Sequence, residues 1–143
     1  DEMDQRNPCP AAIVPQGEGN EHTLHLTIDA SPAWFSPVLH IQRCVDSDDP
    51  LHFAITDEVE MAESSPVVFH LHSHYPLTVI RNVATFTAHN SRLLVTWDWP
   101  GEVIYADVEL QDGDHRPIYH LAIRASASKK HVLVTHLTIE PIA

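Results

Sequence analysis

Apolar and polar residues alternate along most of the chain. Between residues 22 and 28 the apolar side chains are Leu24, Leu26 and Ile28, at every second position, and a strand places such residues on one face. Comparable short runs, rich in β-branched and aromatic residues, follow at 38–42, 51–55, 67–72, 77–81, 84–88, 92–97, 103–110, 117–124 and 131–139. This period of two predicts an all-β protein of nine to ten strands.

Turn-forming residues separate the predicted strands. Asp48-Asp49-Pro50 and Trp99-Pro100-Gly101 each interrupt a pair of strands, and residues 126–130 separate the last two. The Asp112-Gly113 pair lies between two alternating runs and predicts a hairpin. Only residues 57–63 have the composition of a short helix. Short strands joined by such turns are typical of an antiparallel β-sandwich, immunoglobulin-like or related.

The chain length and the positions of Pro and Gly predict the domain organisation. Residues 1–20 hold Pro8, Pro10 and Pro15 together with two glycines, which indicates an irregular, Pro-rich N-terminal arm. Residues 21–143 are expected to form a single β-sandwich domain, because 143 residues is the usual size of one domain. The apolar fraction of 43% is enough for a hydrophobic core.

The charge of the chain narrows its possible partners. Eight Lys and Arg residues stand against 20 Asp and Glu residues, giving a formal net charge of −12 with neutral histidine. Such a charge disfavours nucleic acid and anionic membrane surfaces, and favours a basic protein or a cation. No apolar run approaches the roughly 18 residues of a membrane span, so we expect no membrane-spanning segment in this chain.

The chain has two cysteines, Cys9 and Cys44. We expect a disulfide between them that ties the N-terminal arm to a strand, with two reduced thiols as the alternative. This expectation goes together with an extracellular or cell-surface location, because disulfides persist in oxidising compartments. The two cysteines bracket Trp34 too closely for the true immunoglobulin signature, so the likeness is one of architecture.

Histidine is the main compositional anomaly, with 12 residues in the chain. His70, His72 and His74 alternate along one predicted strand, so their side chains share a face and could bind Zn²⁺ or Cu²⁺. Further ligands would come from another strand, and the candidates are His25, His40, His89, His115, His120 and His136. The alternatives are a solvent-facing polar surface and a pH-sensing role.

Acidic clusters offer weaker candidates for chemistry. Residues 46–49 (Asp-Ser-Asp-Asp) have oxygen ligands that Ca²⁺ could use, but a solvated loop is the favoured interpretation. Asp112-Gly113-Asp114 is interpreted as a turn. The sequence has no nucleophile elbow, no Ser-x-x-Lys, no His-Glu-x-x-His and no Gly-rich phosphate loop, so we predict no enzymatic activity.

Three tryptophans lie in two short segments. Trp97 continues the alternation of Leu93 and Val95 and is predicted to lie in the core. Trp34 and Trp99 are possible interface residues, because tryptophan is frequent at binding hot spots. For Trp99 the alternative is packing over the rim of the core.

One segment resembles a known family. The pattern Val67-Val68-Phe69-x-Leu71-x-Ser73-x-x-Pro76-Leu77, followed by Ser91-Arg92-Leu93, resembles the orphan region of betaglycan and endoglin, the co-receptors of the TGF-β superfamily. The resemblance covers about residues 67–93. It implies an extracellular β-sandwich that binds a dimeric growth factor, without catalysis and without a cofactor.

Three functions therefore stay open. The first is a non-catalytic extracellular protein-binding module, with a growth factor as its ligand. An acidic, all-β chain without catalytic motifs supports this function independently of the resemblance, because a sheet edge can accept a partner strand. The second is a histidine-rich Zn²⁺- or Cu²⁺-binding β-sandwich, and the third is a structural subunit of a larger assembly.

Overall fold

The computed structural model describes residues 13–111 and 116–142, and the described residues form an all-β protein. Nine strands make one continuous sheet, and every pairing in it is antiparallel. The strands are β1 (Gln16–Gly19), β2 (Leu24–Asp29), β3 (Val38–Asp49), β4 (His52–Ser73), β5 (Leu77–Ile80), β6 (Val83–Thr87), β7 (Ser91–Trp97), β8 (Gly101–Gln111) and β9 (Pro117–Pro141). A 3₁₀ turn at Ser31–Ala33 joins β2 to β3. The predicted all-β class is confirmed.

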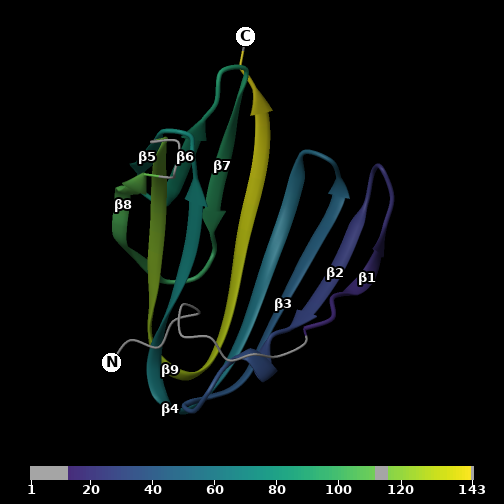
Figure 1. Cartoon of the computed structure of the whole chain (residues 1–143), viewed down its shortest axis with the longest axis vertical. Coiled ribbons are helices and arrows are strands. Elements are labelled where there is room, and N and C mark those ends of the chain that lie inside the picture. The colour runs from purple at the N-terminus through teal and green to yellow at the C-terminus, as the bar shows by residue number, and fades with distance from the viewer. Residues whose placement is uncertain (1–12, 112–115, 143) are drawn as a thin grey trace.

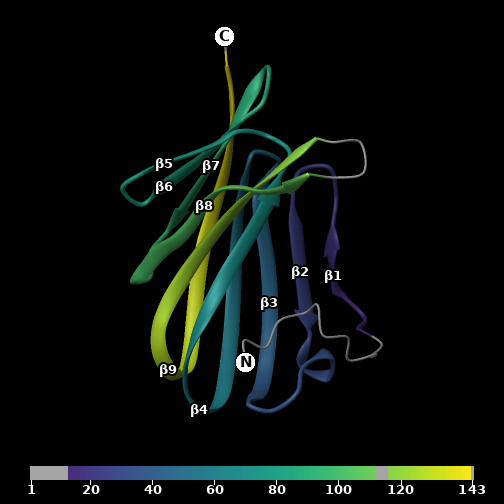
Figure 2. The same ribbon diagram turned by 60° about the vertical axis from the view of Figure 1, so that its left-hand side comes forward.

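The strand order explains how one sheet makes two layers. Its path is β1-β2-β3-β4-β9-β7-β6-β5, and β8 pairs with β9 off this path. The first half of β4 pairs with the second half of β9, from His52↔Thr138 to Glu60↔Lys130. The second half of β4 pairs with the first half of β9, from Val67↔Ala125 to Ser73↔Tyr119. Figures 1 and 2 show both strands curving sharply between these halves, so that the sheet folds over itself.

The bend lies where the ladder between β4 and β9 is irregular. The register shifts between Glu60 and Ser65 and again between Ser65 and Val67, and such bulges bend and twist a strand. The buried His131 places its Nε2 atom 2.9 Å from the carbonyl oxygen of Ser65 and 3.1 Å from that of Ser128. These contacts join the two strands at the bend.

Two sequence-based predictions at the bend are wrong. Residues 57–63 are not a helix but part of β4, because Asp57, Val59 and Met61 are buried at alternate positions in a strand. Residues 126–130 do not end a strand, because β9 continues through them. Conversely, residues 16–19 of the predicted irregular arm form the edge strand β1, whereas residues 1–12 lie outside the described part of the chain.

The hydrophobic core fills the space between the two layers. Leu121 and Ile123 of β9 are fully buried, and they belong to one cluster with Phe86 of β6 and Val95 and Trp97 of β7. The predicted core position of Trp97 is therefore confirmed. Because side chains alternate along β4 and β9, the polar residues between these core residues point away from the core. No helix among the described residues is long and apolar enough to cross a membrane.

Candidate metal centre

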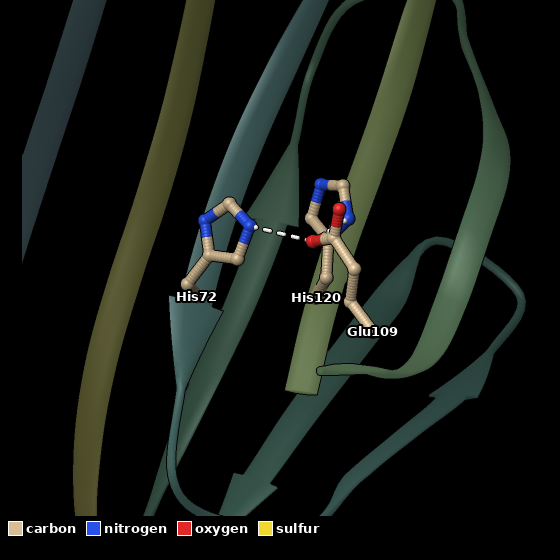
Figure 3. A group of neighbouring side chains, drawn as sticks. All are labelled: His72, Glu109 and His120. Atoms are coloured by element: carbon tan, nitrogen blue, oxygen red, sulfur yellow. Dashed lines mark hydrogen bonds and ion pairs between the residues drawn. The ribbon is translucent and has the colours of Figure 1, made fainter. Parts of the chain in front are cut away.

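The first half of β9 pairs with the second half of β4 on one side and with β8 on the other, and these segments form the second layer of the sandwich, whereas the other strand segments form the first. These three strands bring together His72, Glu109 and His120. His72 lies near the end of β4 and is the register partner of His120, near the start of β9. Glu109 lies near the end of β8, which pairs with β9 on its other side. The β8–β9 register shifts between Val108 and Leu110, so Glu109 is the extra residue of a bulge. The three side chains point toward one another (Figure 3).

The distances among these side chains fit a set of metal ligands. One ligand atom from each residue lies within 4.8 Å of the other two. The Glu109 Oε2 atom is 3.0 Å from His72 Nε2 and 2.8 Å from His120 Nδ1. In a tetrahedral zinc site with bonds of about 2.05 Å, neighbouring donor atoms lie about 3.3 Å apart. Binding an ion would therefore lengthen the two Glu109–histidine separations by a few tenths of an ångström, and the stacked rings of His72 and His120 would have to turn so that their in-plane lone pairs converge.

A third imidazole lies behind His120. His70 Nδ1 is 2.7 Å from His120 Nε2, and the two ring centroids are 5.0 Å apart. The rings of His72 and His120 are stacked at 4.2 Å. If the Nδ1 lone pair of His120 binds a metal, the ring proton of His120 is on Nε2. This N–H group then donates a hydrogen bond to His70 Nδ1. Ligating histidines commonly have such a partner behind the ring.

The histidines that the sequence predicted as metal ligands have different surroundings in the structure. His72 belongs to the cluster, and His120 was one of the further candidates. His70 contacts His120 and is not one of the three grouped ligands. The ring of His74 instead approaches a backbone carbonyl, with Nδ1 3.1 Å from the Pro117 oxygen.

The other candidate histidines have other surroundings. His25 contacts Asp46, His40 contacts Ser31 and His136 contacts Asp98. His89 is exposed, and His115 lies outside the described residues.

Glu109 is the residue that the sequence analysis missed. It lies in the predicted strand 103–110, and carboxylates on strands usually face solvent. The signal that could have found it is the Asp112-Gly113 hairpin, because this hairpin makes the strand containing Glu109 a neighbour of the strand containing His120.

The acidic segment 46–49 has partners within the protein. Asp46 contacts His25, and Asp49 lies 2.6 Å from His52 Nδ1. The backbone amide of Leu51 donates to Asp49 at 2.8 Å. This hydrogen bond lowers the pKa of the Asp49 carboxyl below its ordinary value, and the hydrogen bond with His52 is the next largest cause. These carboxylates therefore stabilise the hairpin end. The favoured interpretation of residues 46–49 as a solvated loop is wrong, because they form the end of β3 with Ser47 buried, and calcium binding stays an untested alternative.

A Ser-His-Asp group occurs beside the 3₁₀ turn, but its order is not that of a catalytic triad. Ser31 Oγ donates to Asp29 at 2.5 Å and lies 3.1 Å from His40 Nδ1. It also accepts the backbone amide of Ile41 at 3.0 Å. In a triad the imidazole lies between the hydroxyl and the carboxylate, whereas here the hydroxyl lies in the middle. This group holds the turn against β3, and it lowers the pKa of Asp29 through the hydrogen bonds from Ser31.

The tryptophans and cysteines have the following environments. Trp99 is buried and belongs to the core cluster, so it is not an exposed interface anchor, and it packs more deeply than the alternative of rim packing implies. Trp34 is half-buried.

Cys44 carries a free thiol, with Sγ 3.5 Å from Thr27 Oγ1. Cys9 lies outside the described residues, so its bridge to Cys44 finds no support here.

Comparison with known proteins gives a fold but no family. No protein-family model and no curated protein matches the chain. Among solved structures, a heparinase III superposes with a TM-score of 0.72 at 13% identity, over 95% of this chain and 22% of its own length. The heparan sulfate lyase HepC from Pedobacter heparinus matches with a TM-score of 0.63 at 12% identity, over 90% of this chain and 22% of its own.

The chain thus spans about a fifth of the length of these neighbours. At such low identity the likeness establishes the β-sandwich fold. The neighbours named here are lyases and not growth-factor co-receptors, so the resemblance to betaglycan and endoglin, the growth-factor partner and the extracellular location stay predictions.

Proposed function

We propose that this chain is a non-catalytic β-sandwich domain that binds a zinc or copper ion through His72, Glu109 and His120. The observation that carries the proposal is the convergence of two imidazoles and one carboxylate from three strands, with ligand atoms within 4.8 Å of one another. Two nitrogen donors favour zinc or copper over calcium or magnesium, which prefer oxygen donors throughout.

Such an ion would act as a structural link. β4, β8 and β9 form the second layer, and β8 is attached to it through β9 alone among the described strands. A metal bound to one residue of each strand would fix the end of this layer near the β8–β9 hairpin. The non-catalytic part of the proposal is supported by the order of the Asp29, Ser31 and His40 side chains, which is not that of a catalytic triad.

Thermal unfolding with and without metal tests the proposal. At a free Zn²⁺ concentration of 100 times Kd, binding stabilises the folded state by about 2.7 kcal/mol. For a chain of this size that corresponds to a rise in Tm of about 10 °C. The same measurement with Cu²⁺ compares the two ions: copper ordinarily binds nitrogen donors more tightly, so a larger rise in Tm with Zn²⁺ than with Cu²⁺ would indicate a geometry that selects zinc.

Two variants test the site itself. They replace ligands whose side chains are partly exposed, so that the substitutions should not disturb folding. His72→Ala and the isosteric Glu109→Gln should each remove most of the shift in Tm. The matched control is His136→Ala, because His136 pairs with Asp98 in the first layer and its removal should leave the shift intact. An equal rise in Tm in all three variants, or no rise in the unmodified chain, would contradict metal binding at this site.

A further inference from the structure

The first layer of the sandwich ends in two edge strands. Among the described strands, β1 pairs only with β2 and β5 pairs only with β6, and Figure 1 shows β1 and β5 at opposite sides of the molecule. An edge strand presents a row of backbone N–H and C=O groups that can pair with a strand of another chain. Each of these two edges can therefore accept a partner strand.

The two edges match each other in direction and length. The path from β1 to β5 has eight strands, and every pairing along it is antiparallel, so β5 runs opposite to β1. A second copy shifted along the layer would bring its β1 beside β5 as an antiparallel neighbour, with the inner faces of both copies on the same side. Both strands have four residues, Gln16–Gly19 and Leu77–Ile80.

The inner-facing residues of the two edges also fit each other. Leu77 and Val79 are half-buried against the core cluster. When all four residues of each strand overlap, these two side chains lie opposite Gly19 and Gly17 of the second copy, which have no side chain to obstruct them. The large residues of one edge thus meet the small residues of the other.

The charges of the chain are distributed so that unlike ends would meet. Residues 64–97, which include β5, contain none of the 20 Asp and Glu residues, and the exposed Arg81 directly follows β5. The β1 end carries Glu18 and Glu21, and residues 13–42 contain no Lys or Arg. Contact between these two ends avoids the repulsion that two acidic surfaces of a chain with a net charge of −12 would experience.

We infer that this chain associates head to tail with further copies of itself, through β5 of one copy and β1 of the next. The interface is heterologous, so each added copy leaves an edge strand open and association continues beyond a dimer. Two strands of four residues bury little surface, so the association is weak and is seen at high protein concentration. It does not depend on the proposed metal centre.

Sedimentation velocity over a concentration series up to about 1 mM tests this inference, in the range of weak association. EDTA is present, so that bound metal does not contribute. The mean sedimentation coefficient should rise with concentration and should include species larger than a dimer.

Charge substitutions at the edge test the register. Thr78 is exposed and lies opposite Glu18 of the next copy in the full overlap. Thr78→Glu should therefore weaken association about two- to fivefold, and Thr78→Lys should strengthen it by a similar factor, because charges directly opposite each other interact across a strand pair. Leu39→Glu is the matched control, because it adds the same charge at an exposed position of β3, which lies at neither edge.

The outcomes decide for or against this interface. Weaker association in Thr78→Glu but not in Leu39→Glu, with recovery when Glu18→Lys is added to Thr78→Glu, would establish pairing between β5 and β1. A monomer at every concentration, or association that stops at a dimer, would overturn the inference. Equal effects of Thr78→Glu and Leu39→Glu, or of Thr78→Glu and Thr78→Lys, would overturn it as well.

Discussion

The hydrogen bond behind His120 allows a quantitative test of how the centre is built. His70→Ala removes the acceptor that lies 2.7 Å from His120 Nε2, and it leaves His72, Glu109 and His120 in place. Removing such an outer partner typically weakens metal binding about 10- to 100-fold, or about 1.4 to 2.7 kcal/mol. Metal binding at Nδ1 makes the Nε2 proton of His120 more acidic and its hydrogen bond to His70 stronger. We therefore expect the loss of metal affinity in His70→Ala to lie within this 10- to 100-fold range rather than near zero.

The assay is a competition titration of Zn²⁺ against a chromogenic chelator at neutral pH. His70→Asn provides the diagnostic comparison, because its amide oxygen can take the place of Nδ1 and accept the same proton. We expect it to recover most of the lost affinity. His74→Ala is the matched control, since His74 Nδ1 lies 3.1 Å from the Pro117 carbonyl oxygen and His74 is not one of the three grouped ligands. The Kd of this variant should stay within about twofold, in line with the small effects of surface substitutions. Unchanged affinity in His70→Ala, or equal losses in the Ala and Asn variants, would refute the assigned role.

Three further predictions concern the scaffold and its pH dependence. Gly101→Ala should destabilise the fold by about 1–3 kcal/mol in urea unfolding, because a methyl group there would overlap the Trp99 ring. Asp57→Ala should cost about 1–3 kcal/mol by the same assay, because it removes both hydrogen bonds that Arg43 donates to this buried carboxylate, at 2.6 and 2.9 Å. The hydrogen bonds described above hold the pKa of Asp49 below its ordinary value, so they stabilise the fold above about pH 4 and this contribution is lost as the pH falls through the folded-state pKa. Asp49→Asn should accordingly reduce the pH dependence of Tm below about pH 4. If Tm falls with acid as steeply in this variant as in the unmodified chain, Asp49 does not make this contribution.

The alternation of apolar residues was sufficient to predict the fold class, but it did not predict the length of the strands. The runs 51–55 and 67–72 belong to one strand, β4, and the runs 117–124 and 131–139 belong to β9. Between them the polar and small residues suggested a helix and a turn, because local composition cannot distinguish a break in a strand from a bulge within it. The bend depends on tertiary contacts, among them that of His131 with the Ser65 carbonyl across 66 residues.

The cluster of His72, Glu109 and His120 could be predicted only in part, and the reason lies in the register of one hairpin. Alternation along one strand placed His70 and His72 on the same face, but the partners of that face depend on the neighbouring strands. A two-residue turn at Asp112-Gly113 would set Glu109 opposite Arg116, whereas the observed register sets Gln111 opposite Pro117 and makes Glu109 the extra residue of a bulge. Because a slip of one residue moves a side chain to the other face of a sheet, the loop length and the bulge together decide whether Glu109 meets His120. The proposed ligand set thus depends on the β8–β9 register, and under the proposed function changes in this hairpin should affect metal binding even where they alter no ligand.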